Sequence, residues 1–276
     1  MQVDSVISNT ISQDIRLKGH QSIRFSPDGF SLLVSDASYK PVLLKQYVYD
    51  ASVTEEKHPS ECRRVLEELE LLNFEGETVF IVDSPAFTLI PAQFYNPELD
   101  RQFLEKSSTL SDSDLTYSRY LRNRNLYILF SVSREIEELK NHMEDTRIIH
   151  ASECLVSLSD QVQASDHQRG AVLAEVQPYT LALLVIQEDG IRLLNRYTLK
   201  DPSDFIYHTL NTIKQLELDR ETIPVYLSGI VHDEHELFGL LGKYIRHVKI
   251  TPYYLEELSR LKMLRYMVLS EGSKCA

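Results

Sequence analysis

The sequence has few of the residues that build cross-links or membrane spans. It contains three cysteines, Cys62, Cys154 and Cys275, which lie far apart. An odd number at this spacing fits neither a disulfide framework nor a zinc knuckle, and it favours a reducing compartment. The longest apolar run, residues 181–186, is far shorter than the roughly 20 residues that cross a bilayer. No basic patch followed by an apolar run opens the chain, so we expect no export signal and a cytoplasmic protein.

Positive charge is scarce as well. The 276 residues include 29 Lys or Arg against 41 Asp or Glu, a formal net charge of −12. A surface of this sign repels phosphate backbones, so we do not expect nucleic acid as the main partner. A single nucleotide stays open, since it needs only a local nest of N–H groups. The phosphate-loop pattern GxxxxGK[ST] and the hydrolase pattern GxSxG are both absent.

The second part of the chain predicts an alternation of strands and helices. After a polar stretch at residues 163–171, three apolar runs joined by tight turns predict a β-meander. Asp201 and Pro202 then match the start of a helix, where a cap is needed and a missing N–H costs nothing. A buried strand, a helix capped by Asp233, another strand and a last helix opened by Thr251 complete the order βββαβαβα.

The same order precedes the polar stretch. Residues 26–29 form a turn between the first two predicted strands, and a buried strand is expected at 78–82 after a helix. Leucines recur at matching places in the two meanders, as at Leu33 and Leu183. We therefore predict an internal duplication, with two related α/β halves.

One segment of the first half has no counterpart in the second. Residues 84–125 hold an apolar run, a helix capped by Asn96 and a basic stretch, and a strand of the main domain is expected directly after them at 126–130. We interpret the segment as an inserted subdomain, which places the domains at residues 1–165 and 166–276. Because grafted segments often carry function, we expect it to dock a protein partner.

Two meanders, each followed by αβαβα, resemble the duplicated RNase H-like halves of the actin-like ATPase fold. Residues 126–155 and 223–245 are similar to the pilus-assembly and cell-division branch of that superfamily, at the exit from its first domain and at its adenosine-side turn. At this length the chain also resembles an uncharacterised bacterial family, a domain of unknown function with an actin-like ATPase fold. The resemblance spans residues 20–270 and implies the fold more strongly than the activity.

The resemblance implies an Asp on the first strand of each half and a Gly or Ser/Thr turn that holds phosphate. In the first hairpin, Phe25 stands where the acid is expected, and Pro27 removes a backbone donor. In the second hairpin, Glu175 stands at the acid position, either as a ligand or as a carboxylate without a metal. Pro178 and Tyr179 replace the glycine-rich turn there, and a tyrosine ring obstructs the close approach of phosphate to backbone.

The third element follows the buried strand of each half. The superfamily commonly has two adjacent glycines there; this chain has Ser228 and Gly229, and the first half has Ser84 and Pro85. A lone glycine is also explained by a backbone requirement. We therefore predict that ATP hydrolysis is lost and that no cofactor is needed. If ATP and Mg²⁺ do bind, we expect Glu175, Ser228 and Gly229 to contact them.

Two other clusters have the composition of binding sites. His232 and His235 flank carboxylates in the stretch HDEHE, a spacing that fits either a metal site or a solvated helix start. We predict the helix start and no metal, because no third ligand cluster is near in the sequence. Residues 117–127 interleave Arg with Tyr, which fits an acidic partner, an RNA contact or, as we predict, a solvated helix with ion pairs.

We expect from these observations a non-catalytic actin-like binding or assembly scaffold. The alternative is a nucleotide-binding ATPase or switch that uses the cleft between two lobes. A third hypothesis, a nucleic-acid factor, would depend on Arg122 and Arg124.

Overall fold

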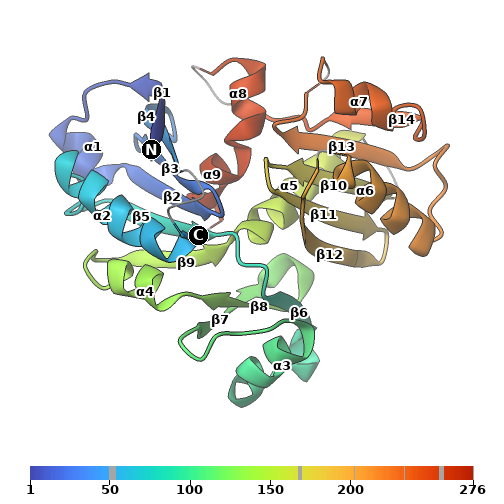
Figure 1. Cartoon of the computed structure of the whole chain (residues 1–276), viewed down its shortest axis with the longest axis horizontal. Coiled ribbons are helices and arrows are strands. Elements are labelled where there is room, and N and C mark those ends of the chain that lie inside the picture. Colours follow the sequence, from blue (N-terminus) through green and yellow to red (C-terminus); the bar gives the residue numbers. More distant parts are fainter. Residues whose placement is uncertain (50–53, 167–169, 202, 233, 255–257, 276) are drawn as a thin grey trace. The chain divides into compact units, whose positions relative to one another are not determined.

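The computed structural model describes residues 1–49, 54–166, 170–201, 203–232, 234–254 and 258–275 (Figure 1). The chain divides into two compact units. Unit 1 contains Met1–Glu153 and Leu269–Ala276, and unit 2 contains Cys154–Val268.

The main sheet of unit 1 has six strands in the order β1-β4-β3-β2-β5-β9. Its members are β1 (Gln2–Ser8), β2 (His20–Ser26), β3 (Gly29–Ser35), β4 (Pro41–Val48), β5 (Glu77–Val82) and β9 (Thr146–His150). Strands β2, β3 and β4 form the expected antiparallel meander, and β5 and β9 continue the sheet in parallel with β2. The first strand, β1, was not predicted, because it is largely exposed and has no alternating apolar face. Backbone pairing with β4 holds it at the edge of the sheet.

Short helices lie between the strands of unit 1 along the chain. They include α1 (Gln13–Lys18), α2 (His58–Glu68) and α4 (Arg134–Lys140), with a 3-10 turn η1 (Glu55–Lys57) before α2. Helix α2 begins at His58, directly before Pro59, and buries Cys62, Val65 and Leu66. The side chain of Ser133 caps α4 by accepting a hydrogen bond from the Ile136 N–H.

The insertion forms a sheet of its own, in the order β6-β8-β7. It is made of β6 (Phe87–Pro91), β7 (Leu115–Leu121) and β8 (Leu126–Val132), with helix α3 (Asp100–Ser107) and the 3-10 turns η2 (Ala92–Phe94), η3 (Pro97–Leu99) and η4 (Arg122–Arg124). Ile90, Leu104 and Leu129 form its small core. The strand expected at 126–130 is therefore the centre of this sheet and not part of the main one. The basic stretch is strand β7 followed by η4, so the prediction of a helix there was wrong.

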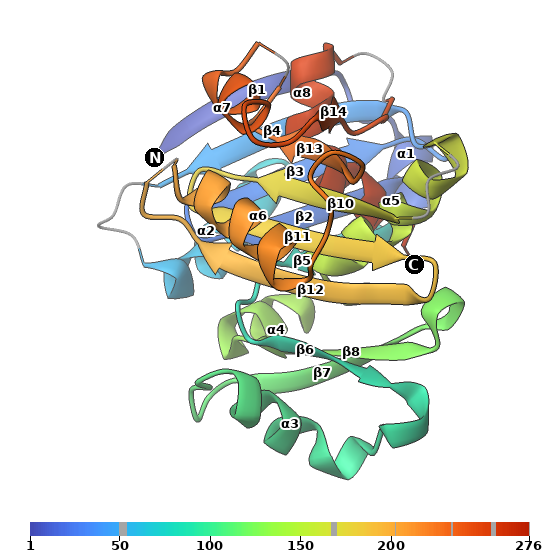
Figure 2. The same cartoon turned by 90° about the vertical axis from the view of Figure 1, so that its right-hand side faces the viewer.

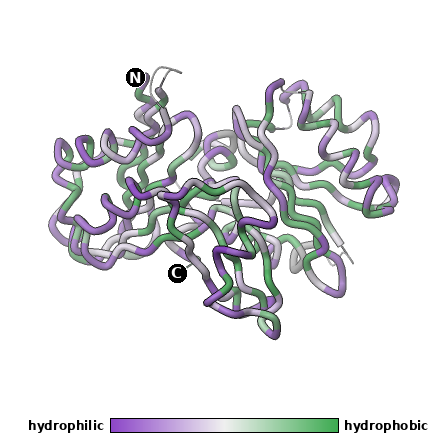
Figure 3. Tube along the Cα trace, turned by 60° about the horizontal axis from the view of Figure 1, so that its bottom comes forward, coloured by the Kyte–Doolittle hydropathy of each residue, from purple (hydrophilic) through white to green (hydrophobic). Residues whose placement is uncertain are grey.

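The main sheet of unit 2 has five strands in the order β12-β11-β10-β13-β14. They are β10 (Gly170–Val176), β11 (Thr180–Gln187), β12 (Gly190–Thr198), β13 (Pro224–Gly229) and β14 (His247–Ile250). An antiparallel meander is again followed by two parallel strands. Figure 2 shows helix α6 (Asp204–Gln215) lying across one face of this sheet, where Phe205 and Ile213 join the core. Figure 3 colours the chain by hydropathy, and its hydrophobic segments agree with fully buried strands such as β3 and β10.

Several helix boundaries differ from those predicted. Helix α6 begins at Asp204, whose carboxylate accepts from the N–H groups of Lys200 and Asp201; Pro202 lies outside the described residues. No helix begins at Thr251, because its N–H and hydroxyl both donate to the Leu227 carbonyl. Helices α8 (Arg260–Arg265) and α9 (Met267–Gly272) come later, and residues 255–257 are not described.

Two helices remain. Helix α5 (Ala151–Asp166) follows β9, and α7 (Glu236–Leu241) follows β13. Helix α7 is capped by the ring of His235 rather than by Asp233, which lies outside the described residues. Within the part of the chain that the structure describes, no helix is both long and apolar enough to cross a membrane.

Candidate functional site

The three residues predicted to contact a nucleotide lie side by side in unit 2. The parallel pairing of β10 with β13 sets Glu175 opposite Ser228 and Val176 opposite Gly229. Both Glu175 and Ser228 are buried. The Ser228 hydroxyl donates to the Ala174 carbonyl at 3.4 Å, so it is engaged with the backbone of the neighbouring strand.

The glycine at position 229 is required by the backbone itself. Its φ is +85°, which side chains of L residues rarely tolerate. A Cβ at Gly229 would lie 1.9 Å from the Val176 carbonyl oxygen. The same oxygen accepts a hydrogen bond from the Ile230 N–H at 2.8 Å. The close approach of β13 to β10 therefore explains this glycine without a ligand.

The Glu175 carboxylate is held inside the protein by two neighbours. Gln177 Nε2 donates to Glu175 Oε1 at 3.0 Å, and Arg196 Nη1 lies 3.9 Å from Glu175 Oε2. The side chains of Glu175 and Arg196 are 1% and 3% exposed. Ala182 is in register with both residues, one strand from each, so its small side chain leaves room for the arginine to reach across. An interior acid with a guanidinium beside it is a structural ion pair more readily than a metal ligand.

The acid position of the first hairpin belongs to the hydrophobic core. The Phe25 ring is 6% exposed and packs edge-on against Phe80, with ring centroids 5.5 Å apart. In the turn that follows, Ser26 Oγ donates to the Asp28 carboxylate at 2.7 Å. Gly29 has φ +147°, and a Cβ there would meet the Tyr47 carbonyl, so this glycine also serves the sheet.

The histidines of the HDEHE stretch turn toward the backbone. His232 Nδ1 accepts from the Glu234 N–H at 3.3 Å, and His235 Nδ1 accepts from the Leu237 N–H at 3.2 Å. The His235 bond caps the start of α7. Over the described residues, no group of three or more His, Cys, Asp or Glu side chains is arranged to hold a metal ion.

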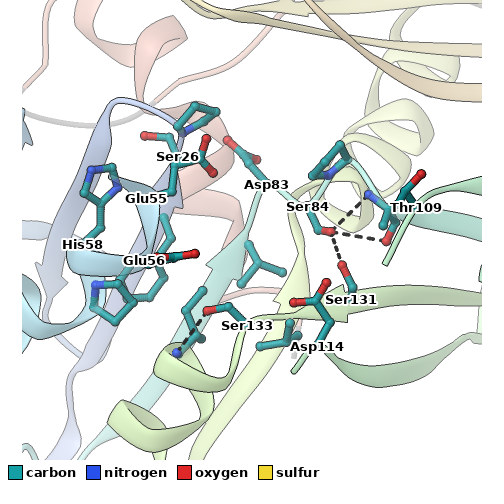
Figure 4. A pocket seen from close by; sticks show the side chains of 18 residues that line it. Ser26, Glu55, Glu56, His58, Asp83, Ser84, Thr109, Asp114, Ser131 and Ser133 are labelled. Atoms are coloured by element: carbon teal, nitrogen blue, oxygen red, sulfur yellow. Dashed lines mark hydrogen bonds between the residues drawn. The ribbon is translucent and has the colours of Figure 1, made fainter. Parts of the chain in front are cut away.

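Sequence reasoning did not find the pocket in unit 1, a cavity of about 350 Å³ (Figure 4). It opens where β2 and β5 end, between the start of α2 and the insertion, and we call it the unit 1 pocket. Phe25, Val82, Ala86, Val132 and Ile136 supply much of its apolar lining. One signal was available: ligands of α/β folds commonly bind at the carboxyl ends of parallel strands, and β2 and β5 are parallel neighbours.

Polar groups of the unit 1 pocket are fixed by contacts with one another. The hydroxyls of Ser84 and Ser131 are hydrogen-bonded at 2.8 Å. The Asp83 carboxylate pairs with Arg24 at 2.9 Å, and these side chains are 2% and 7% exposed. Figure 4 shows Glu55 and Glu56 on one side of the pocket, with Asp114 on the other.

Buried polar contacts also join the insertion to the main sheet of unit 1. His150 Nε2 donates to the Ser84 carbonyl at 2.9 Å, since a carbonyl can only accept. Arg119 Nε donates to Glu153 at 2.8 Å, and Glu153 also accepts from the His150 N–H at 2.9 Å. Burial raises the pKa of Glu153, while the nearby Arg119 opposes that shift. One wall of the unit 1 pocket is thus firmly anchored.

The main sheets of the two units share one strand order, and a third sheet is inserted in unit 1. This arrangement defines an actin-like ATPase fold, and solved structures agree. A Bacteroides thetaiotaomicron protein with an actin-like ATPase fold and unknown function matches with a TM-score of 0.76 at 20% identity, over 87% of this chain and 92% of that one. The PilM–PilN type IV pilus biogenesis complex matches at 0.59 and 13% identity, over 92% and 97%. The chain belongs to the protein family of unknown function DUF3822, whose model matches residues 8–248. No curated protein matches it.

Proposed function

We propose that this chain is a non-catalytic actin-like protein that binds a protein partner as a scaffold. The observation that carries the proposal is the burial of Phe25 at the acid position of the first hairpin. A phenyl ring packed on Phe80 can hold neither a metal ion nor a water for attack on phosphate. Moving it out to admit an acid would open the core of the main sheet.

The second hairpin supports the same proposal. Glu175 is the acid that remains, and it is neutralised by Arg196 and hydrogen-bonded by Gln177. Binding Mg²⁺ would require this carboxylate to give up its buried ion pair with the guanidinium. The turn itself is closed by a bond from the Gln177 N–H to the Thr180 carbonyl, so that donor is not open to a phosphate.

Binding of a protein partner is supported by the insertion and by one neighbour. The insertion has its own core and sheet and is anchored by buried contacts at His150 and Glu153, which suits a rigid docking element. PilM, a protein of the same fold, was solved in complex with PilN. We extend to this chain the general property, a protein partner held by an actin-like fold, and not the identity of that partner.

Shared strand order also supports our proposal that the two halves arose by duplication. The order β4-β3-β2-β5-β9 in unit 1 repeats as β12-β11-β10-β13-β14 in unit 2, with the same parallel and antiparallel pairings. If both halves once had a free acid in the first hairpin, replacing it by Phe25 in one half and pairing Glu175 in the other would remove ATP hydrolysis and leave the fold intact.

Isothermal titration with ATP and Mg²⁺ tests the loss of nucleotide chemistry. We expect no binding heat at millimolar nucleotide and no phosphate release. Micromolar binding that disappears in Glu175→Gln, with an unchanged melting temperature, would instead establish the alternative, a nucleotide-dependent switch.

A capture experiment tests the protein partner. The purified chain is used to capture proteins from its own host, alongside a variant with its insertion core opened by Leu104→Ala. Loss of a specific partner in that variant is expected; equal capture by both would contradict docking on the insertion.

A further inference from the structure

The unit 1 pocket has the size and lining of a site for one or two side chains. Its volume of about 350 Å³ is at the lower end of the range of small-ligand pockets. The lining includes Pro27, Pro59 and Pro85 beside the apolar floor. Proline fixes φ, so these parts of the wall lose little conformational freedom when a ligand binds.

The rim of the unit 1 pocket is acidic. Glu55, Glu56 and Asp114 lie on it, and among the described residues no Lys or Arg lines the cavity. Asp83 also lines it, but its carboxylate is already paired with Arg24. Two effects raise the pKa of Glu55: desolvation, which is the larger, and the nearby Asp28 carboxylate. A cation placed beside Glu55 would therefore stabilise its charged form.

His58 adds an open acceptor at the wall of the unit 1 pocket. Its side chain is 2% exposed, and its ring donates a hydrogen bond to the Ser26 carbonyl. The Nε2 atom has no hydrogen-bond partner among the described residues. Burial lowers the pKa of His58, so the ring is neutral and Nε2 carries a lone pair. A buried acceptor without a donor is unfavourable, and a hydrogen bond from a ligand N–H would remove that cost.

We propose that the unit 1 pocket receives a short extended segment of a protein partner, with an apolar side chain on its floor and a Lys or Arg at its acidic rim. This inference rests on the proposed function, because it names the chemistry of the partner. Three rim carboxylates repel a phosphate or an acidic peptide, so an anionic occupant is excluded. Where the structure describes the chain, these acids form no metal-holding group, which argues against a divalent ion.

The test selects from a phage-displayed library of random peptides of about ten residues, using the full chain as bait. Enriched peptides are expected to carry Lys or Arg next to an apolar residue. Their affinity should fall at least about tenfold at low salt in Glu55→Lys/Glu56→Lys, and the difference should shrink at high salt as the charges are screened. The control Glu75→Lys/Glu98→Lys reverses two exposed glutamates of unit 1 outside the pocket and should bind like wild type.

A second variant and a second probe distinguish a peptide site from a site for small amines. Ala86→Leu fills the floor of the unit 1 pocket and should abolish peptide binding at every salt concentration, provided that its melting curve stays cooperative. Agmatine and spermidine serve as free cations, and if they bind as tightly as the peptides, the occupant is a small amine and the proposal is wrong. Enrichment of acidic peptides, no enrichment, or cationic peptides that ignore both pocket variants would also overturn it.

These outcomes are distinct from failure of the proposed function. A partner whose binding depends on the insertion, but not on Glu55 and Glu56, would remove this inference and leave the scaffold standing. Micromolar binding of ATP and Mg²⁺ would contradict the non-catalytic proposal and would leave the result with the peptides unchanged.

Discussion

Replacing Gly229 with alanine tests whether this glycine belongs to the sheet or to a ligand. The residue ends β13 with φ +85°, and an added Cβ would stand 1.9 Å from the Val176 carbonyl oxygen. Carbon and oxygen in ordinary contact are more than 3 Å apart, so β10 and β13 must separate at this point. That separation would stretch the hydrogen bond from the Ile230 N–H to the same carbonyl.

The expected cost has two parts. Holding alanine at positive φ costs about 1–2 kcal/mol. Weakening one buried backbone hydrogen bond adds about 1 kcal/mol, and residual overlap with the strand adds about as much again. The sum is about 3–4 kcal/mol. For a unit of this size, each kcal/mol lowers the melting temperature by about 3–5 °C, so Gly229→Ala should melt at least about 10 °C below wild type.

Thermal unfolding followed by circular dichroism measures this effect, and two other glycines serve as controls. Gly190 has φ +121° but nothing within 4 Å of an added Cβ, so Gly190→Ala carries the conformational cost without the collision. Gly239 lies in α7 with open space around it, and Gly239→Ala should be neutral or slightly stabilising. The expected order of melting temperatures is Gly239→Ala highest, Gly190→Ala next and Gly229→Ala lowest.

Two results would contradict this account of Gly229. If Gly229→Ala melts with Gly190→Ala, the collision with Val176 does not contribute. If it melts like wild type but loses a nucleotide that wild type binds, the glycine serves a ligand and its role in the backbone is secondary.

Three further predictions concern how the insertion is anchored. Arg119→Ala leaves Glu153 buried without its cation and should cost about 3 kcal/mol in urea unfolding. Because burial raises the pKa of Glu153, stability is lost as pH rises through that pKa, so the cost should be larger near pH 8 than near pH 5, and an added Glu153→Gln should remove the difference. Leu104→Ala should cost about 2–5 kcal/mol within the insertion core, and hydrogen exchange should speed up there while the main sheets stay protected. His150→Phe removes the donor to the Ser84 carbonyl and should cost about 1–3 kcal/mol; an unchanged urea midpoint would show that the bond adds nothing.

Some predictions from local chemistry were confirmed. The turn at residues 26–29 joins β2 and β3, and Asn96 accepts from the Glu98 N–H at the start of η3, as its side chain predicts. Such turns and caps depend on a few neighbouring residues, so the sequence can carry their signal, although the helix starts predicted at Asp201 and Thr251 differ in the structure. Buried strands such as β5 and β13 were found for the same reason, since an apolar run between turns has few other uses.

Predictions that needed a neighbouring element were less reliable. The edge strand β1 is largely exposed, so no apolar pattern marks it. It is held by backbone pairing with β4, which side chains do not encode. Residues 117–127 were assigned to a helix from their charges, although residues 117–121 belong to strand β7, which pairs with β8. Thr251 was expected to open a helix, but its bonds to the Leu227 carbonyl hold it beside β13. In each case a tertiary partner outweighed a local preference.

The three-stranded meander in each half, the net negative charge and the absence of a glycine-rich phosphate turn follow from the amino-acid sequence alone, because each depends on composition or on residues close together in the chain. The roles of the polar residues depend instead on the tertiary structure. In the sheet of unit 2, Ala182 lies between Glu175 and Arg196 on the neighbouring strands. In unit 1, the turn after β2, the start of α2 and the insertion surround one pocket. Side chains on different strands meet only through the register of a folded sheet, and no local pattern records that register.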